Sequence, residues 1–402
     1  MSEMSYLEKL LDGVEVEWRN LGDTSLFEIA NNGRKPVKAS LRIAGETPYY
    51  GANNIQDYVD GYTHDGEYVL IAEDGSASLE NYSIQYATGK FWANNHVHVV
   101  RGKERVHSRF LYHYLCIVNF LPFLTGGGRA KLTKGQLIEI PVPIPCPDNP
   151  EKSLAIQSEI VRILDKFTAL TAELTAELNM RKKQYNYYRD QLLSFKEGEV
   201  EWKTLEEVLV DKFWIMPATP KFDDNGEIPY ITSKNISGGN IDFERVKHIS
   251  RDDFLSISKN RPILKGDFLI SMIGTIGEIA RVKCLDPDFY GQNMYLIRLN
   301  EELLHPRYFL HFFDSPRMKF YFKSVKNNSG QGYLKANNID GLSIPLPSID
   351  EQQKIAFILD KFDTLTNSIT EGLPREIELR QKQYEYYRDL LFSFPKPEAV
   401  SN

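Results

Sequence analysis

The sequence predicts an α+β fold in which two α/β domains are separated by two long antiparallel coiled-coil helices, in a circular pseudo-two-fold repeat. Three observations predict it. The chain repeats itself, because ILDKFTALT from Ile163 recurs as ILDKFDTLT from Ile358, and KQYNYYRDQLLSF from Lys183 recurs as KQYEYYRDLLFSF from Lys382. Apolar residues around these repeats alternate at three- and four-residue intervals, as in a coiled coil. Between the repeats lie two stretches of about 130 to 150 residues with short β-rich runs and Gly- and Asn-rich turns.

The repeat extends beyond the helices. EVEW at 15–18 recurs at 199–202, VPIP at 142–145 matches IPLP at 344–347, and PYYGANNI from Pro48 matches PYITSKNI from Pro229. The amino-terminal YLEKLLDGVEVEW resembles YRDQLLSFKEGEVEW at the end of the first helix, and the carboxy-terminal YRDLLFSFPKPE stops where the amino terminus takes over. We therefore expect the two termini to lie close together. The predicted division is a first α/β domain over 1–150, a first long helix over 151–198, a second α/β domain over 199–347 and a second long helix over 348–402.

One residue pattern inside each α/β domain also repeats. His107, Arg109, Phe110 and His113 match His305, Arg307, Tyr308 and His311 at a single offset. Each pattern lies on an aromatic segment, RFLYHYL in the first half and RYFLHFF in the second, whose spacing predicts a short helix.

The two long helices differ at one place each. The first carries a literal repeat, TAELTAEL at 171–178, which interrupts the seam of the coiled coil with a doubled step of four. The second contains Gly372 and Pro374, which predict a kink or a break. A helix of about 40 residues would be about 60 Å long. The alternative is that these segments are core helices inside compact domains.

The TAEL repeat has the dimensions of a spacer. Adding four residues to a straight helix shifts it by about 6 Å and rotates it by about 40°. One base pair of B-DNA rotates by about 34 to 36°. The sequence therefore suggests a hypothesis in which the number of TAEL units acts as a ruler along DNA.

Composition and charge exclude several classes. With 42% hydrophobic and 26% charged residues the chain is globular, and its net charge of −7 argues against a protein that coats nucleic acid by bulk charge. The three cysteines are far apart and in no CxxC spacing, which disfavours a disulfide framework or a thiolate zinc site and fits a reducing cytoplasm. The amino terminus does not read as a secretory signal, and the longest apolar stretch, 110–124, is too short to span a bilayer. We expect a cytoplasmic protein with no membrane partner.

Basic residues gather locally on this acidic chain. Between Gly89 and Ile138 the sequence has eight basic residues and one acidic residue, Glu104. The matching part of the second half is also basic. Two basic faces suggest two surfaces that follow phosphates, and an ordinary solvated face is the alternative. Reading bases needs amides, hydroxyls and guanidinium groups on loops. The candidates are Asn53, Asn54, Lys90, Asn94, Asn95, Gly127, Arg129 and Lys131 in the first half, and Thr232, Ser233, Lys234, Asn235, Gln292, Asn293, Asn328, Ser329, Gln331 and Lys335 in the second. Each is also an ordinary turn residue.

Motifs for catalysis are missing from the sequence. It has no GxxxxGK[ST] loop, HExxH pair, GxSxG elbow or NPP[YF] motif. His96 and His98 alternate along a strand, yet nothing near them in the sequence completes a metal site, so we interpret them as packing or phosphate contacts. Asp74-Gly75-Ser76 and Gly274-Thr275 are interpreted as turns. We expect no catalytic residue and no metal ligand.

These features together resemble the specificity subunit of type I restriction-modification enzymes. The segments that carry the resemblance are EQQKIAFILDKFDTL and ELRQKQYEYYRDLLFSF, with their copies, the IP-rich segments and the circular arrangement. The TAEL repeat narrows it to the subgroup in which such a repeat helps to set the gap in a bipartite target. By this resemblance 14–147 and 199–347 are target recognition domains, and 157–195 and 352–394 are conserved spacers. The family's EQ pair is present as Glu351 and Gln352, but the first copy departs from it with AIQSEI at 155–160.

The resemblance implies a non-catalytic DNA-binding subunit. Each recognition domain would read one half of a split double-stranded DNA target, and half-sites about one helical turn apart leave a gap of about six or seven base pairs, of which two TAEL copies favour about six. The helices would dock two methyltransferase subunits, which methylate adenine, and thereby the restriction and translocase subunits. S-adenosylmethionine, ATP and Mg²⁺ would belong to those partners, and this chain would bind no cofactor. The candidate docking and spacer residues are Phe167, Leu170, Leu174, Leu178, Tyr185, Tyr188, Phe362, Leu365, Tyr384 and Tyr387.

Two other functions stay open at the level of the sequence. The chain could be a protein-binding adaptor whose twin domains bind proteins across a helical strut. It could also be a self-sufficient methyltransferase or nuclease, which the missing catalytic motifs disfavour.

Overall fold

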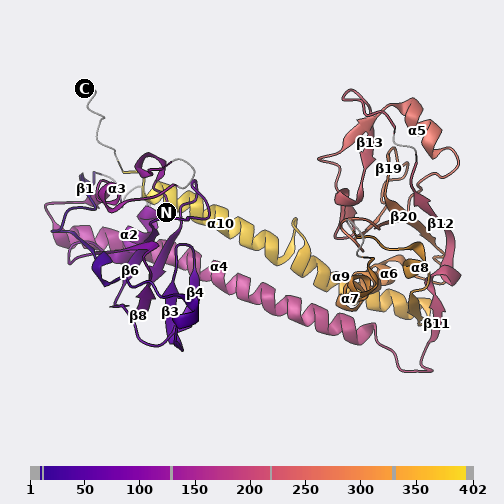
Figure 1. Cartoon of the computed structure of the whole chain (residues 1–402), viewed down its shortest axis with the longest axis horizontal. Coiled ribbons are helices and arrows are strands. Elements are labelled where there is room, and N and C mark those ends of the chain that lie inside the picture. Colours follow the sequence, from indigo (N-terminus) through magenta and orange to yellow (C-terminus); the bar gives the residue numbers. More distant parts are fainter. Residues whose placement is uncertain (1–9, 11–12, 127–129, 218–219, 328–331, 395–402) are drawn as a thin grey trace. The chain divides into compact units, whose positions relative to one another are not determined.

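The computed structural model describes residues 10, 13–126, 130–217, 220–327 and 332–394. The chain divides into two compact units, Met1–Leu174 with Ile377–Asn402 and Thr175–Glu376. Each unit contains one α/β domain and parts of two long helices (Figure 1). The fold class is the predicted α+β. The predicted closeness of the termini falls on residues outside the described ranges.

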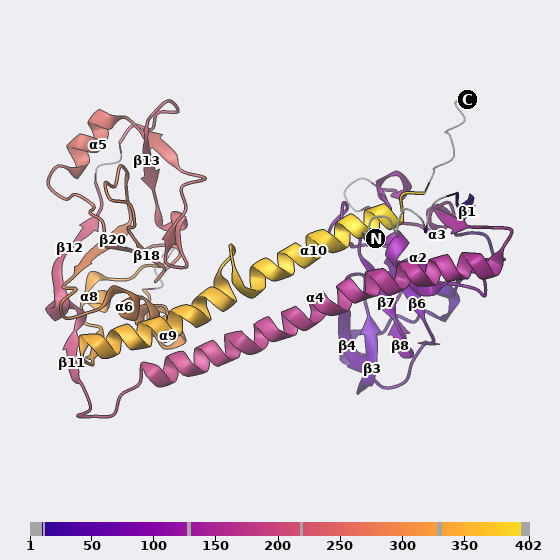
Figure 2. The ribbon, with the colours of Figure 1, turned by 180° about the vertical axis from the view of Figure 1, so that it is seen from behind.

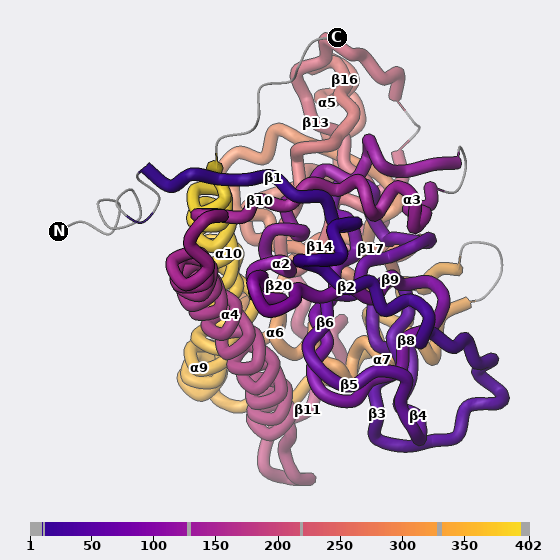
Figure 3. The backbone as a smooth tube through the Cα atoms, turned by 90° about the vertical axis from the view of Figure 1, so that its left-hand side faces the viewer, coloured from indigo at the N-terminus to yellow at the C-terminus, as the bar shows by residue number. Residues whose placement is uncertain are grey.

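The first unit contains two four-stranded sheets and a closing ribbon. The sheets have the orders β2-β9-β6-β7 and β4-β3-β8-β5. Strand β1 pairs antiparallel with β10, and the two lie side by side in Figure 3. The ribbon therefore joins the repeated EVEW and IP-rich segments. The strands are β1 Val16–Asn20, β2 Phe27–Ile29, β3 Ala44–Tyr50, β4 Ile55–Val59, β5 His64–Asp65, β6 Tyr68–Ala72, β7 Ile84–Ala87, β8 Lys90–Ala93, β9 Val97–Gly102 and β10 Pro141–Pro145. The short helices are η1 Asn31–Gly33, η2 Ala39–Leu41, α2 Ser108–Leu115, η3 Leu121–Phe123 and α3 Lys134–Leu137.

The second unit repeats the ribbon and the main sheet. Here β11 pairs antiparallel with β21, and the sheets have the orders β12-β20-β17-β18, β16-β13-β19 and β14-β15. The strands are β11 Glu201–Thr204, β12 Leu209–Ile215, β13 Ile228–Ile231, β14 Ile236–Ser237, β15 Asn240–Ile241, β16 Lys247–Ile249, β17 Phe268–Ser271, β18 Ile279–Arg281, β19 Tyr290–Gly291, β20 Met294–Leu299 and β21 Ser343–Leu346. The short helices are η4 Leu205–Val208, η5 Ser233–Asn235, α5 Arg251–Ser258, α6 Pro306–Phe313, α7 Pro316–Val325 and α8 Ala336–Asp340.

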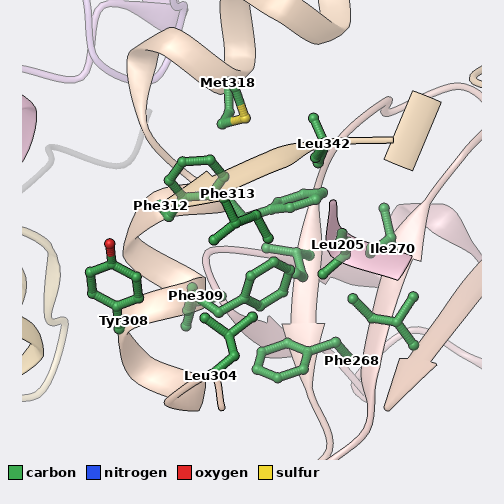
Figure 4. Packing of buried hydrophobic residues seen from close by; sticks show 14 of the residues in the cluster. Leu205, Phe268, Ile270, Leu304, Tyr308, Phe309, Phe312, Phe313, Met318 and Leu342 are labelled. Carbon is green, nitrogen blue, oxygen red and sulfur yellow. The ribbon is translucent and has the colours of Figure 1, made fainter. Parts of the chain in front are cut away.

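The predicted aromatic helices, α2 and α6, anchor the two cores. In α6, Tyr308, Phe309 and Phe313 are fully buried, with Phe309 against Phe268 of β17 (Figure 4) and Phe313 against Phe322 of α7. Burying each such side chain stabilises the fold by about 1.5 to 3 kcal/mol. Both helices start after a histidine, His107 or His305, with extended backbone, which lets the chain enter the helix from β9 or β20.

The long helices are α4 Pro150–Leu192, α9 Ile349–Asn367 and α10 Gly372–Leu391. The first is continuous over 43 residues. The second is broken, as predicted, at 368–371. Gly372 has φ +78°, and a Cβ built on it would lie 2.5 Å from the carbonyl oxygen of Thr364. The break therefore needs a glycine, both for the left-handed backbone and for the close approach.

Each unit contains the start of one long helix and the end of the other. In the first unit α4 and the end of α10 run side by side in opposite directions, with Phe167 stacked on Tyr387 at 5.2 Å between ring centroids (Figure 2). In the second unit Phe362 of α9 stacks on Tyr185 and Tyr188 of α4, at 6.1 and 5.5 Å. The antiparallel pairing is confirmed in both units.

The same helix ends also belong to the cores of the units. Ile160 and Leu164 of α4, and Leu359 of α9, have no exposed surface. Both interpretations of the long helices are therefore correct. Some of their residues pair the helices, as in a coiled coil, and others belong to the core of a compact unit. The boundary between the units falls after Leu174, between the two TAEL copies. The four-part domain division made from the sequence stays a prediction.

Candidate nucleic-acid interface

Two loops at one sheet edge gather most of the predicted base-reading residues. In the first unit β3 and β8 pair in parallel through Tyr49 with Trp92 and Tyr50 with Ala93, so the segments that follow both strands leave the same edge. The backbone N–H of Asn94 donates to the carbonyl of Tyr50 at 3.2 Å. Residues 51–54 and 94–95 therefore lie together.

The second unit builds the same edge. Here β13 and β19 pair in parallel, and the N–H of Gln292 donates to the carbonyl of Ile231 at 3.2 Å. Residues 232–235 therefore lie beside Gln292 and Asn293. The structure thus places the candidates of both halves at equivalent positions on equivalent strands.

A third and a fourth segment meet in each unit. After β6, Asp74 forms a bridge with Lys131, and the N–H of Leu132 donates to the carbonyl of Glu73 at 2.8 Å. After β17, Ile273 forms the equivalent bridge with Tyr333, and Leu334 donates to Met272 at 2.9 Å. Thr125–Lys131 and Asn327–Tyr333 form the bases of two matching loops. The candidates Gly127, Arg129, Asn328, Ser329 and Gln331 lie outside the described residues.

In the first unit the loops surround a hollow of about 630 Å³. Asn53 ties two of the loops together, because its Nδ2 donates to the carbonyl of Gly75 at 2.9 Å and its Oδ1 accepts from the N–H of Ala77 at 2.8 Å. The hollow is lined by Ala52, Asn53, Asn54, Gln56, Asp74, Gly75, Ser76, Leu79, His96 and Ala130. In the second unit Thr275 Oγ1 makes the corresponding tie by donating to the carbonyl of Ser233 at 2.9 Å.

Several predicted asparagines hold the loops rather than projecting from them. Asn94 is buried and its Oδ1 accepts from the N–H of His96 at 2.8 Å. Asn235 is buried too, and its Oδ1 accepts from the N–H of Thr232 at 2.9 Å. With Asn53, these amides support the backbone in the manner of turn residues. Their exposed neighbours Asn54, Asn95 and Lys234 project from the same loops.

Two lysines among the candidates lie outside these loops. Lys90 begins β8, at the opposite end of the strand from Asn94, and its Nζ lies 4.7 Å from the ring centroid of Tyr62. Lys335 is exposed and precedes α8, where its N–H donates to Oδ1 of Asn338 at 2.9 Å. Asn293 has φ +63°, a left-handed conformation that asparagine tolerates well.

A charged cluster lies beneath the first interface. Glu73 accepts from Arg34 Nη1 at 2.6 Å and pairs with Lys131 Nζ at 3.0 Å. Burial works to raise the pKa of Glu73, but the hydrogen bonds from Arg34 and Lys131 outweigh it and lower the pKa. His98 lies beside them, fully buried, with its Nε2 2.7 Å from the carbonyl of Leu132, and burial lowers its pKa. Its role is packing, one of the two roles expected for it.

Sequence reasoning missed Gln56, Asp74 and Ser76 as part of this surface, because it interpreted Asp74-Gly75-Ser76 only as a turn, whereas His96 was already considered as a packing or phosphate contact. His96 Nδ1 lies 2.6 Å from Asp74 Oδ1 on the rim of the hollow. A signal was present, because Gly75 and Gly274 follow the two buried strands β6 and β17 at equivalent places and both have positive φ, +68° and +81°. Among the described residues no group of three or more His, Cys, Asp or Glu could hold a metal ion. Within the same residues no helix has the length and apolar character needed to cross a membrane.

The candidate docking residues mostly face inward within the units. Tyr185 is 5% exposed, while Phe167, Leu170, Leu174, Leu178, Phe362, Leu365, Tyr384 and Tyr387 are partly buried. Tyr188 is 45% exposed. The ring contacts of Phe167 with Tyr387, and of Phe362 with Tyr185 and Tyr188, hold the helix pairs together. The role of the whole set toward other subunits stays a prediction.

Comparisons with known proteins identify the family. The model of the type I restriction modification DNA specificity domain matches residues 14–181 and 198–379. A putative type I restriction enzyme specificity subunit of Haemophilus influenzae is 47% identical over 97% of this chain and 98% of its own length. The EcoR124I/EcoR124II specificity subunit of Escherichia coli is 42% identical over 100% of both chains. The crystal structure of the S subunit of a type I restriction-modification system from M. genitalium covers 96% of this chain and 98% of that one, with a TM-score of 0.59 and 15% identity, which shows the shared fold.

The fold, the duplicated interface and these matches define the chain as a DNA specificity subunit. It belongs to the family of type I restriction-modification specificity subunits, with two DNA specificity domains in one chain. The resemblance stated from the sequence is confirmed, and so is the expectation that the chain serves recognition rather than catalysis. Membership of the TAEL subgroup stays a prediction.

Proposed function

We propose that each α/β domain reads one half of a bipartite double-stranded DNA target, with a gap of about six base pairs between the halves. One observation carries the proposal. The same four loop positions recur at one edge of both domains, while the side chains on them differ, as in GANN at 51–54 against TSKN at 232–235. The two domains share the backbone framework of these loops but carry different side chains on it. This suits two domains that both bind DNA but recognise different base sequences.

The chemistry of the loops suits DNA. Exposed amides and lysines, such as Asn54, Asn95 and Lys234, are groups that hydrogen-bond to base edges in the major groove. The basic residues of the same domains, with Lys131 at a loop base, provide contacts to phosphates. The candidate residues named from the sequence, including those outside the described residues, are proposed as the DNA-contacting set.

The partners follow from the family. We propose that the helices dock two methyltransferase subunits, which methylate adenine from S-adenosylmethionine, and through them the restriction and translocase subunits that use ATP and Mg²⁺. Support comes from the relatives, which are named as subunits of type I restriction enzymes. The assembly would act in the cytoplasm.

The test is an exchange of one domain. The chain is expressed with methyltransferase subunits, and methylated adenines are mapped across a genome before and after residues 199–347 are replaced by those of a relative. We expect a split target in which only one half changes. Matched replacement of residues 14–147 should change only the other half.

Two results would contradict the proposal. A methylated target sequence without a gap would be incompatible with two domains that each recognise one half of it. A target that is indifferent to either exchange would favour the alternative, a protein-binding adaptor with twin interaction domains on a helical strut.

A further inference from the structure

A buried histidine joins three elements in the first unit. His113 of α2 has no exposed surface. Its Nε2 lies 2.8 Å from Asp165 Oδ1 on α4, and its Nδ1 lies 3.3 Å from the phenol oxygen of Tyr384 on α10. One side chain of the recognition domain therefore contacts both long helices of its unit.

The second unit contains the same junction. His311 of α6 is 3% exposed, its Nε2 lies 2.6 Å from Asp360 Oδ1 on α9, and its Nδ1 lies 3.0 Å from the phenol oxygen of Tyr185 on α4. The aspartates belong to the two DKF segments, and the tyrosines belong to the two QYxYYRD segments. The strongest sequence repeats of the chain, DKF and QYxYYRD, therefore meet at the histidine in each unit. The same atoms make the same contacts in both units.

Further bonds at the junction repeat as well. Arg109 Nε donates to Asp165 at 2.8 Å, and Arg307 Nε donates to Asp360 at 2.8 Å. About two helical turns before each aspartate, Gln157 Oε1 accepts from the N–H of His107 at 2.8 Å in the first unit, and Gln352 Oε1 accepts from the N–H of His305 at 2.8 Å in the second. Gln157 therefore does in the first copy what the glutamine of the EQ pair does in the second, although the sequence around it departs from the family pattern.

The hydrogen-bond directions at the histidine follow from its neighbours. An ionised carboxylate only accepts, so the Nε2 of each ring carries the proton and donates to the aspartate. The Nδ1 is then the acceptor and the tyrosine hydroxyl donates to it. Burial lowers the pKa of His113 to about 4, and for Asp360 the hydrogen bonds from His311 and Arg307 overcome the opposing effect of burial and hold its pKa at about 2. At His113 a neutral ring with one donor and one acceptor fits a single orientation of α2, α4 and α10.

We propose that His113 and His311 are positioning residues that hold each recognition domain in one orientation on its helix pair and so restrict the DNA gap that the chain accepts. This inference rests on the proposed bipartite reading. An apolar contact would tolerate rotation of the domain, because dispersion and burial are not directional, whereas two hydrogen bonds to opposite sides of one ring do not. A domain that turns on its helices changes where its loops meet the bases.

The experiment uses the full chain in complex with its methyltransferase subunits and the target mapped by domain exchange. Duplexes carry both half-sites with the native gap or with one base pair more or fewer. His113→Gln can keep an N–H donor at the position of Nε2 for Asp165 but has no acceptor at the position of Nδ1 for Tyr384, while Tyr384→Phe removes the same hydrogen bond from the other side. The matched control is Tyr58→Phe, which loses a hydroxyl from an exposed ring of β4 in the same unit.

We expect the preference for the native gap to fall about fivefold in His113→Gln and in Tyr384→Phe, the factor for one lost hydrogen bond. The double variant should be no worse than the worse single one, because both remove the same bond. His311→Gln and Tyr185→Phe should repeat the effect from the second unit. Tyr58→Phe should keep the wild-type preference.

The opposite outcomes are distinct. If the variants bind all duplexes more weakly but keep the wild-type preference, the junction only stabilises the fold and the inference is overturned. If the wild-type complex itself shows no preference for a gap, the bipartite reading fails before the junction is tested by variants. Thermal unfolding of each variant in the complex confirms that the compared samples are folded.

Discussion

At the scale of single residues, the interface separates side chains that build loops from side chains that project from them. Asn53, Asn94 and Asn235 use their amides on neighbouring backbone groups. Replacing such an asparagine would disturb a loop and leave backbone groups unpaired. The exposed Asn54, Asn95 and Lys234 can be replaced without that consequence, so they are the better positions at which to alter the target sequence.

Glu73 gives the first prediction at this scale. Its side chain is 15% exposed and neutralises Arg34 and Lys131 under the first interface. Glu73→Gln removes the negative charge that pairs with the cations of Arg34 and Lys131. We therefore expect the free energy of unfolding to fall by about 1 to 3 kcal/mol. Chemical denaturation measures this change. Binding to DNA should weaken as well, because Lys131 loses the contact that holds it at the loop base.

The control for Glu73 is a similar pair on the surface. Glu28 and Arg101 are also 2.6 Å apart, but their side chains are 36% and 39% exposed. Glu28→Gln should cost less than about 1 kcal/mol, as is usual for exposed pairs. Equal effects of the two substitutions would show that the buried cluster has no special role.

At the scale of elements, the two long helices should respond differently to a change in their length. α4 is continuous through both TAEL copies, whereas α9 and α10 are separated by the break at 368–371. A change in the length of α4 therefore falls within one continuous helix. In the second long helix, the break between α9 and α10 is a point at which a change in length can be absorbed.

The TAEL repeat gives a prediction about spacing. Inserting a third TAEL after Leu178 adds about 6 Å and about 40° to α4. We expect the gap of the methylated target to lengthen by about one base pair, since one pair of B-DNA rotates by about 34 to 36°. Mapping of methylated adenines measures the gap. An unchanged gap would contradict the ruler.

Gly372 gives a prediction about the break. Gly372→Ala places a side chain in the left-handed region, which costs about 1 to 2 kcal/mol, and brings its Cβ against Thr364. The loss of unfolding free energy should exceed about 2 kcal/mol. Gly198→Ala is the control, because Gly198 has φ +83° with nothing within 4 Å and should pay only the backbone cost. Equal losses would mean that the close approach to Thr364 is relaxed without cost.

At the scale of the whole molecule, the repeat places two equivalent apolar residues on exposed helix faces. Met180 of α4 is 45% exposed and Leu379 of α10 is 38% exposed, and they precede the repeated KQY by the same distance. The inward positions of the helices are occupied within each unit. Exposed, duplicated positions suit a partner that binds twice, so we place the proposed docking of the two methyltransferase subunits on these faces.

The prediction is a change in stoichiometry. Met180→Glu or Leu379→Glu should each remove about one of two methyltransferase subunits from the purified complex, because a buried unpaired charge costs more than one interface contact provides. Native mass spectrometry counts the subunits. Leu285→Glu, at a position 73% exposed in the second recognition domain, should leave both bound. Retention of both subunits in the two helix variants would move docking to another face.

The sequence by itself determined the repeat, the fold class, the long helices and the break at Gly372, because periodicity and backbone requirements are local properties of the chain. It also located the loops that carry the candidate readers, since turn residues mark them. Only the tertiary structure decided which asparagines are structural, and it brought His113 to Asp165 and Tyr384. Those contacts join residues 52 and 271 positions apart, a pairing set by packing that local pattern does not encode.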